Sequence, residues 1–104
     1  MWNMEFERES IMTEIQRVTI IVHGRVHGVF FRDTTMRKAR ELGLAGDVRN
    51  LPEGTVQIVA QGTRPSLDDL IRWAHKGSPA SVVSKVEVSF ESPKPGFIDF
   101  MVEY

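Results

Sequence analysis

The fold is decided by residues 17–42, which read RVTIIVHGRVHGVFFRDTTMRKAREL. At its start, three apolar side chains alternate with their neighbours, the period of a strand with one buried face: Val18, Ile20 and Val22. At its end, side chains recur at helical spacing before a glycine at position 43, where helices often stop: Thr35, Met36, Ala39 and Leu42. Between them, Gly24 and Gly28 indicate a tight connection with unusual backbone torsions. The stretch therefore predicts a strand, a loop and a helix over 32–42.

The rest of the chain predicts further strands and one more helix. Strands over 44–50 and 55–61 are joined by a turn-rich hairpin at 51–54. After a break at 62–66, one stripe of apolar side chains predicts a second helix: Leu67, Leu70, Ile71 and Ala74. Strands over 85–90 and 97–103 follow, with alternate side chains inward: Val86, Val88, Phe90, Ile98, Phe100 and Val102.

This order of elements, β-α-β-β-α-β plus a terminal strand, is that of the α+β, ferredoxin-like sandwich. Two right-handed crossovers place both helices on one face of an antiparallel sheet. We expect the folded domain to occupy residues 17–104 and residues 1–16 to be a disordered N-terminal extension.

Composition excludes several classes of protein. The 104 residues are 41% hydrophobic and 26% charged, as in ordinary globular domains. There is no cysteine, which removes disulfide scaffolds, thiolate metal sites and cysteine nucleophiles. No stretch approaches the roughly 18 apolar residues of a membrane span, and the acidic start does not resemble a secretory signal. We expect a cytoplasmic monomer with no membrane partner.

Charge is concentrated in the middle of the chain. Residues 17–50 hold seven basic and three acidic side chains, although the net charge of the whole chain is −1. An anionic partner would be attracted to this segment.

The predicted topology brings two features of this segment to the same edge of the sheet. The loop at 24–28 leaves the first strand there and feeds a helix N-terminus, and Asn50 ends a second strand that runs the same way. Backbone N–H groups in such a loop, together with a helix N-terminus, can hold an anion, and Arg32 can add two hydrogen bonds to it. The same features also occur in a plain turn with a solvated arginine. The nucleotide-binding patterns GxxxxGK[ST] and GxGxxG are absent.

The residues at 24–32, GRVHGVFFR, resemble the phosphate-binding signature of the acylphosphatase family, and GDVRN at 46–50 followed by GTV at 54–56 resembles its second segment. The resemblance implies a hydrolase that cleaves acyl phosphates to carboxylate and inorganic phosphate without a metal or other cofactor. It implies that Arg32 binds the phosphate and that Asn50 orients the attacking water. Backbone amides would form the phosphate cradle, from these residues: Val26, His27, Gly28, Val29, Phe30 and Phe31.

Three positions depart from the family pattern. His27 stands where glutamine is usual. We expect an ordinary loop histidine; the alternative is a ring that faces solvent near the phosphate and adds positive charge below about pH 6.5. Asp47 stands where tryptophan is frequent, and we expect it to face solvent on an outward strand position. Glu103 replaces the arginine that usually precedes the last tyrosine and so removes a positive charge.

Two alternative functions remain. A ferredoxin-like sheet can bind single-stranded RNA, but that requires aromatic side chains on the central strands, and none is expected there. An inactive relative that only senses acyl phosphates is the second alternative. Other polar or aromatic candidates have structural explanations: His23, His75, Trp73, and the pair Asp68 and Asp69, which we expect in the first turn of the second helix, where its dipole favours acids.

Overall fold

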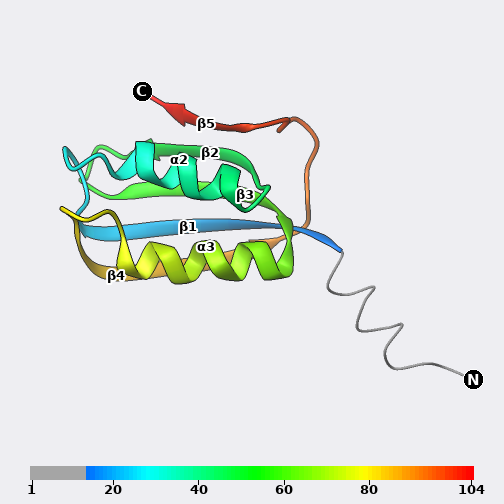
Figure 1. The fold of residues 1–104 in the computed structure, drawn as a ribbon, viewed down its shortest axis with the longest axis horizontal. Helices are drawn as coiled ribbons and strands as arrows, with labels where there is room; N and C mark the ends of the chain where they lie inside the picture. The colour runs from blue at the N-terminus through cyan, green and yellow to red at the C-terminus, as the bar shows by residue number, and fades with distance from the viewer. Residues whose placement is uncertain (1–13) are drawn as a thin grey trace, which may run out of the picture.

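The fold comes from a computed structural model that describes residues 14–104. The chain contains five strands and two helices (Figure 1). Their order is β1 (Ile15–Arg25), α2 (Phe31–Glu41), β2 (Ala45–Asn50), β3 (Val56–Thr63), α3 (Arg64–Lys76), β4 (Val82–Glu91) and β5 (Phe100–Glu103). The sequence predicted each of these elements, with boundaries that differ by up to a few residues. Because β1 begins at Ile15, the sheet starts two residues before the predicted domain boundary. Residues 1–13 of the predicted extension lie outside the described residues.

The strands form one sheet in the order β4-β1-β3-β2-β5. Strands β1 and β2 both pair antiparallel with β3, so they run in the same direction on either side of it. Strand β5 pairs parallel with β2, which makes the sheet mixed. The ferredoxin-like prediction is confirmed, and the parallel arrangement of β1 and β2 brings their carboxyl ends to one edge.

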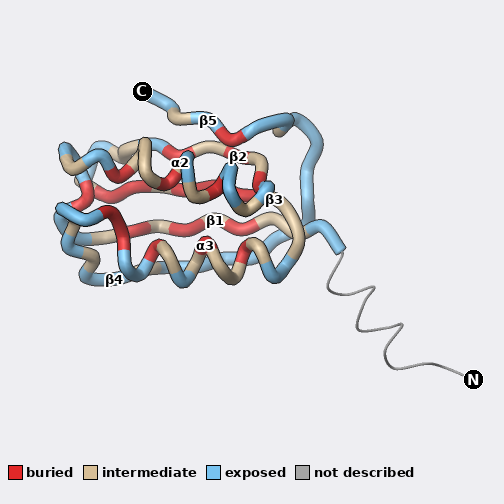
Figure 2. Tube along the Cα trace, viewed as in Figure 1, coloured by how far each residue is buried: buried red, intermediate tan, exposed pale blue. Residues whose placement is uncertain are grey.

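Both helices cover the same face of the sheet, and the buried residues lie between the two layers (Figures 1 and 2). From the sheet, the predicted inward side chains of β1 are fully buried: Val18, Ile20 and Val22. From the helices, the core takes Ala39 of α2 and Leu67, Leu70 and Ala74 of α3. Burial of each large apolar side chain contributes about 1.5–3 kcal/mol, so this layer holds the helices on the sheet.

The predicted break at 62–66 is wrong, because β3 continues to Thr63 and α3 starts at the next residue. Gly62 lies within the strand, where an added Cβ would meet the Leu44 side chain at 2.4 Å. Pro65 lies in the first helical turn, where its missing N–H costs nothing. Both residues resemble chain breakers locally, but here each has a structural role inside an element.

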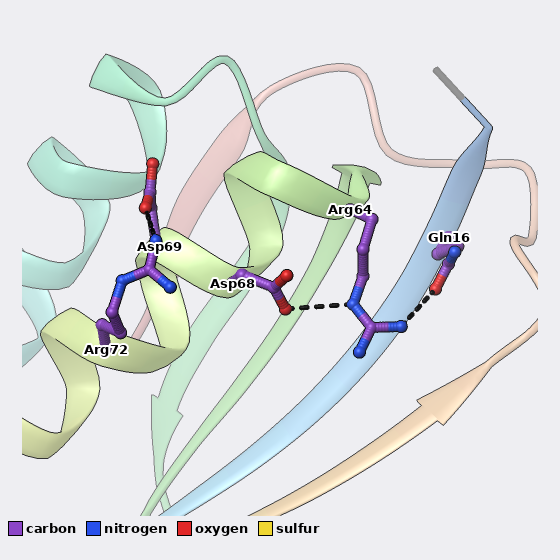
Figure 3. A network of polar contacts seen from close by, with 5 residues as sticks. All are labelled: Gln16, Arg64, Asp68, Asp69 and Arg72. Atoms are coloured by element: carbon purple, nitrogen blue, oxygen red, sulfur yellow. Dashed lines mark hydrogen bonds and ion pairs between the residues drawn. The ribbon is translucent and has the colours of Figure 1, made fainter. Parts of the chain in front are cut away.

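The early helix start also changes the explanation of the two acidic residues of α3. The first turn contains no acidic residue, so the expected dipole effect is wrong. Instead, Asp68 accepts a hydrogen bond of 3.0 Å from Arg64, and Asp69 pairs with Arg72 (Figure 3). Arg64 also donates to the Gln16 side chain of β1 at 3.4 Å. These are exposed contacts, each worth about 0–1 kcal/mol.

Three predicted inward positions are partly or fully exposed. Val88 and Phe90 remain 38% and 39% exposed because β4 is an outer strand of the sheet formed by residues 14–104. The guanidinium of Arg64 lies 4.0 Å from the centroid of the Phe90 ring. Ile98 is 99% exposed because β5 begins two residues later. Phe100, the first residue of β5, is fully buried as predicted. Within residues 14–104, neither helix is long and apolar enough to cross a membrane.

Candidate active site

Two glycines with a positive φ lie where the chain leaves β1, one near the end of the strand and one in the loop that follows. Gly24 has a φ of 125° at a bulge in the β1–β4 pairing, and a Cβ there would lie 2.1 Å from the Val82 carbonyl oxygen. Gly28 has a φ of 69°. Gly24 lies within β1, which ends at Arg25, so the predicted loop at 24–28 starts two residues later than expected, and Gly28 lies in the turn from β1 into α2.

The amino end of α2 has unpaired backbone donors. The residue before the helix, Phe30, has left-handed torsions (φ 57°, ψ 25°) and makes no side-chain cap. The first hydrogen bond of the helix runs from the Thr34 N–H to the Phe30 carbonyl, at 3.0 Å. The N–H groups of residues 31–33 therefore have no partner within the helix, and they carry the partial positive charge of its dipole. An anion fits this position.

Two side-chain hydrogen bonds attach the loop to the rest of the protein. Ser78, which is buried after α3, donates through Oγ to the Val29 carbonyl at 3.1 Å. The ring of His27 donates through Nε2 to the Thr55 carbonyl at 2.8 Å. The His27 residue is exposed, but its ring links the loop to the β2–β3 hairpin, a contact that its sequence position did not reveal. Val26 and Phe31 are 2% exposed and fix the two ends of the loop in the core.

Arg32, in the first turn of α2, is held by the end of the chain. Its Nη1 donates to the Glu103 carbonyl at 2.9 Å, and its Cζ lies 4.7 Å from the centroid of the Tyr104 ring. Neither contact was predicted from the sequence. Because the Glu103 contact uses the backbone, it does not depend on the acidic side chain that departs from the family pattern.

Asn50 is the last residue of β2 and pairs with Val56 of β3. Its Oδ1 is buried and has no hydrogen-bond partner within the described part of the chain. A buried polar atom without a partner costs free energy, so such atoms often mark a site for a water or a ligand.

These groups surround one cavity of about 330 Å³. The loop and α2 contribute Val26, Gly28, Phe30, Phe31, Arg32 and Asp33, and Asn50 and Tyr104 complete the lining. The predicted catalytic pair, Arg32 and Asn50, is therefore brought together with the predicted loop. Two predicted loop residues, His27 and Val29, are not among the lining residues. The carboxylate of Asp33 is 2.8 Å from Arg37, which balances its charge.

Asp47 does not belong to this cavity. It lies on the other face of the sheet, as predicted, but its side chain is only 13% exposed and pairs with Arg49 at 3.0 Å. It lines a second hollow together with residues 96–99, part of the segment between β4 and β5. That segment is attached to β3 by two hydrogen bonds of 3.0 Å between Gln61 and the Lys94 backbone. The expectation that Asp47 faces solvent is wrong because a segment distant in sequence covers it.

Known proteins are similar to this chain in sequence and in fold. The family model for acylphosphatase matches residues 18–102. An acylphosphatase of Rubrobacter xylanophilus is 46% identical over 89 residues, which are 86% of this chain and 81% of that protein. Two solved acylphosphatase structures superpose well: that of Coxiella burnetii (38% identity, TM-score 0.81, 86% of this chain and 93% of that one) and that of Bacillus subtilis (35% identity, TM-score 0.83, 86% and 99%). The chain therefore belongs to the acylphosphatase family and is an enzyme of that type.

Proposed function

We propose that the enzyme hydrolyses acyl phosphates to a carboxylate and inorganic phosphate without a metal ion, with Arg32 as the phosphate-binding residue and Asn50 as the residue that orients the attacking water. One observation carries the proposal: a single cavity is lined by the uncapped start of α2, by Arg32 and by Asn50, whose buried oxygen has no hydrogen-bond partner among residues 14–104.

The phosphate group is assigned to the amino end of α2. Unpaired N–H groups there can donate to its oxygens, and the guanidinium of Arg32 can add charge-assisted hydrogen bonds. Such fixed donors act most strongly where negative charge increases in the transition state.

The attacking water is assigned to Asn50. An amide oxygen accepts a hydrogen bond from the water and so directs a lone pair towards phosphorus. The new bond forms between the water oxygen and phosphorus, and the bond from phosphorus to the carboxylate oxygen breaks. A phosphate oxygen accepts the proton from the water. The leaving carboxylic acid has a pKa of about 4, so the carboxylate departs without a general acid.

Metal independence is supported by the kinds of side chain at the site. Positive charge for the phosphate is available from Arg32 and the helix. In residues 14–104, no group of three or more His, Cys, Asp or Glu side chains is arranged to hold a metal ion.

Hydrolysis of benzoyl phosphate in excess EDTA tests the proposal, with Arg32→Ala as the control. We expect rapid turnover that the substitution abolishes. Turnover that disappears with EDTA alone would contradict metal independence. No turnover, with inorganic phosphate still shifting the amide NMR signals of residues 26–32, would indicate the phosphate sensor instead.

The remaining predictions concern partners and location. The absence of a nucleic-acid partner is supported by the outward side chains of β1 and β3, because Thr19, Ile21, Gln57 and Val59 have no aromatic ring. The His23 ring on the same face lies 3.4 Å from the Glu87 carboxylate. The monomeric state stays a prediction. A cytoplasmic location is supported by the lack of cysteine. Size-exclusion chromatography with light scattering tests the monomeric state, and an RNA titration tests the absence of a nucleic-acid partner.

A further inference from the structure

Two aromatic side chains of the cavity lining are exposed, which is unusual for residues of this size. Phe30 is 82% exposed and Tyr104 is 95% exposed, and both line the cavity that contains Arg32 and Asn50. The adjacent Phe31, by contrast, is 2% exposed and packs against Trp73 with ring centroids 5.4 Å apart. Core packing therefore explains Phe31 but not Phe30 or Tyr104.

The backbone of Phe30 makes its exposure more notable. Across residues 14–104, it is the only residue other than glycine with a positive φ. Bulky side chains rarely adopt this conformation, and strained positions of this kind concentrate at functional sites. A phenylalanine that contributes little to the core and occupies a strained position at a cavity mouth needs another reason to be there.

Tyr104 provides a second aromatic ring in the cavity lining. Tyr104 stacks with Arg32 at 4.7 Å and so is placed by the residue that we assign to the phosphate. When the phosphate occupies the amino end of α2, the rest of the substrate extends into the remaining cavity, which Phe30 and Tyr104 also line. The volume of about 330 Å³ is at the lower end of the range for small-molecule sites, roughly 300–1,000 Å³, and exceeds the needs of a phosphate group alone.

We infer that Phe30 and Tyr104 form the binding site for the acyl group and select acyl phosphates with an aromatic or extended apolar acyl chain over small ones such as acetyl phosphate. This inference rests on the proposed function. Its physical basis is the stacking and apolar contact that aromatic rings offer to a flat or apolar group.

The test compares kcat/KM for benzoyl phosphate and acetyl phosphate. The wild-type enzyme should prefer benzoyl phosphate. Phe30→Asn removes the ring but suits left-handed torsions, and it should lower kcat/KM for benzoyl phosphate about tenfold and reduce the value for acetyl phosphate much less. Phe30→Tyr, which keeps an aromatic ring, should keep the preference for benzoyl phosphate. Ile98→Asn removes an equally exposed apolar side chain outside the cavity and should leave the ratio unchanged.

The outcomes separate the inference from the function on which it rests. Equal losses for both substrates in Phe30→Asn, or no loss for either, would overturn the acyl-group site while the hydrolase assignment stands. A Phe30→Tyr enzyme that behaves like Phe30→Asn would also overturn it. A wild-type enzyme that hydrolyses neither substrate would overturn the proposed function itself, and the acyl-group site with it.

Discussion

The guanidinium of Arg32 donates a hydrogen bond of 2.9 Å to the carbonyl oxygen of Glu103, and thereby joins the start of α2 to the end of β5. The ring of Tyr104 lies against the same guanidinium. An arginine side chain has many rotamers, so these contacts hold its charge at the cavity before a substrate arrives. Such preorganisation lowers the entropic cost of the reaction.

Loss of the Tyr104 ring should therefore weaken catalysis through Arg32. We expect Tyr104→Leu to lower kcat/KM for acetyl phosphate about two- to fivefold, the effect of an exposed cation–π contact. Tyr104→Phe keeps the ring and is the control. Steady-state kinetics measure kcat/KM for both variants. An equal decrease in Tyr104→Leu and Tyr104→Phe would contradict this role of the ring.

Arg32→Ala should remove the main positive charge at the phosphate. We expect turnover to fall by about 10³-fold, and the NMR shifts induced by inorganic phosphate in residues 26–32 to disappear. Arg72→Ala on α3 removes an exposed charge whose partner, Asp69, also lies outside the cavity, and should keep both turnover and phosphate binding. Retention of phosphate binding in Arg32→Ala would disprove the assigned contact.

Asn50→Ala should separate turnover from phosphate binding. We expect a loss of about 10²–10³-fold in kcat because the water loses its orienting group, while inorganic phosphate still shifts the loop amides. Kinetics and an NMR titration on the same sample measure both effects. A near wild-type kcat would show that Asn50 does not position the water.

Gly46→Ala should destabilise the fold without touching the cavity. Gly46 has a φ of 151°, and an added Cβ would lie 1.8 Å from the Val59 carbonyl oxygen of the neighbouring strand. We expect the free energy of unfolding to fall by about 3 kcal/mol or more in urea denaturation. Gly43→Ala is the matched control, since its φ is 73° but its Cβ would meet nothing within 4 Å. The free energy of unfolding of Gly43→Ala should fall by about 1 kcal/mol. Equal decreases in the two variants would refute the steric explanation.

The pairing of Lys85 with Glu87 on β4 should make the stability of the folded state depend slightly on pH. The hydrogen bond and charge of Lys85 lower the pKa of Glu87 below its usual 4.5. The folded state thus favours the ionised carboxylate, and this stabilisation is present above the usual pKa and is lost as the pH falls through the lowered one. We expect Lys85→Met to raise the pKa of Glu87 in a carboxyl NMR titration, and Lys94→Met to leave it unchanged.

Local patterns in the sequence were sufficient for the order of the elements and for the loop. The alternation of Val18, Ile20 and Val22 reports a buried strand face, and the glycines at 24 and 28 report the turn, because each depends on a few consecutive residues. The shared edge of the loop and Asn50 followed from the topology of these elements. The structure confirms that they line one cavity with Arg32, while their catalytic roles remain to be tested.

Only the tertiary structure decided how these residues are held and covered. Arg32 is oriented by Glu103 and Tyr104, His27 is bonded to Thr55, and Asp47 is covered by the segment after β4. The exposure of Val88 and Phe90 also depends on tertiary structure, because β4 is an outer strand of the sheet. Local periodicity carries no information about which distant backbone carbonyl, ring or segment will lie against a side chain, and at this site such contacts decide where the charges are placed.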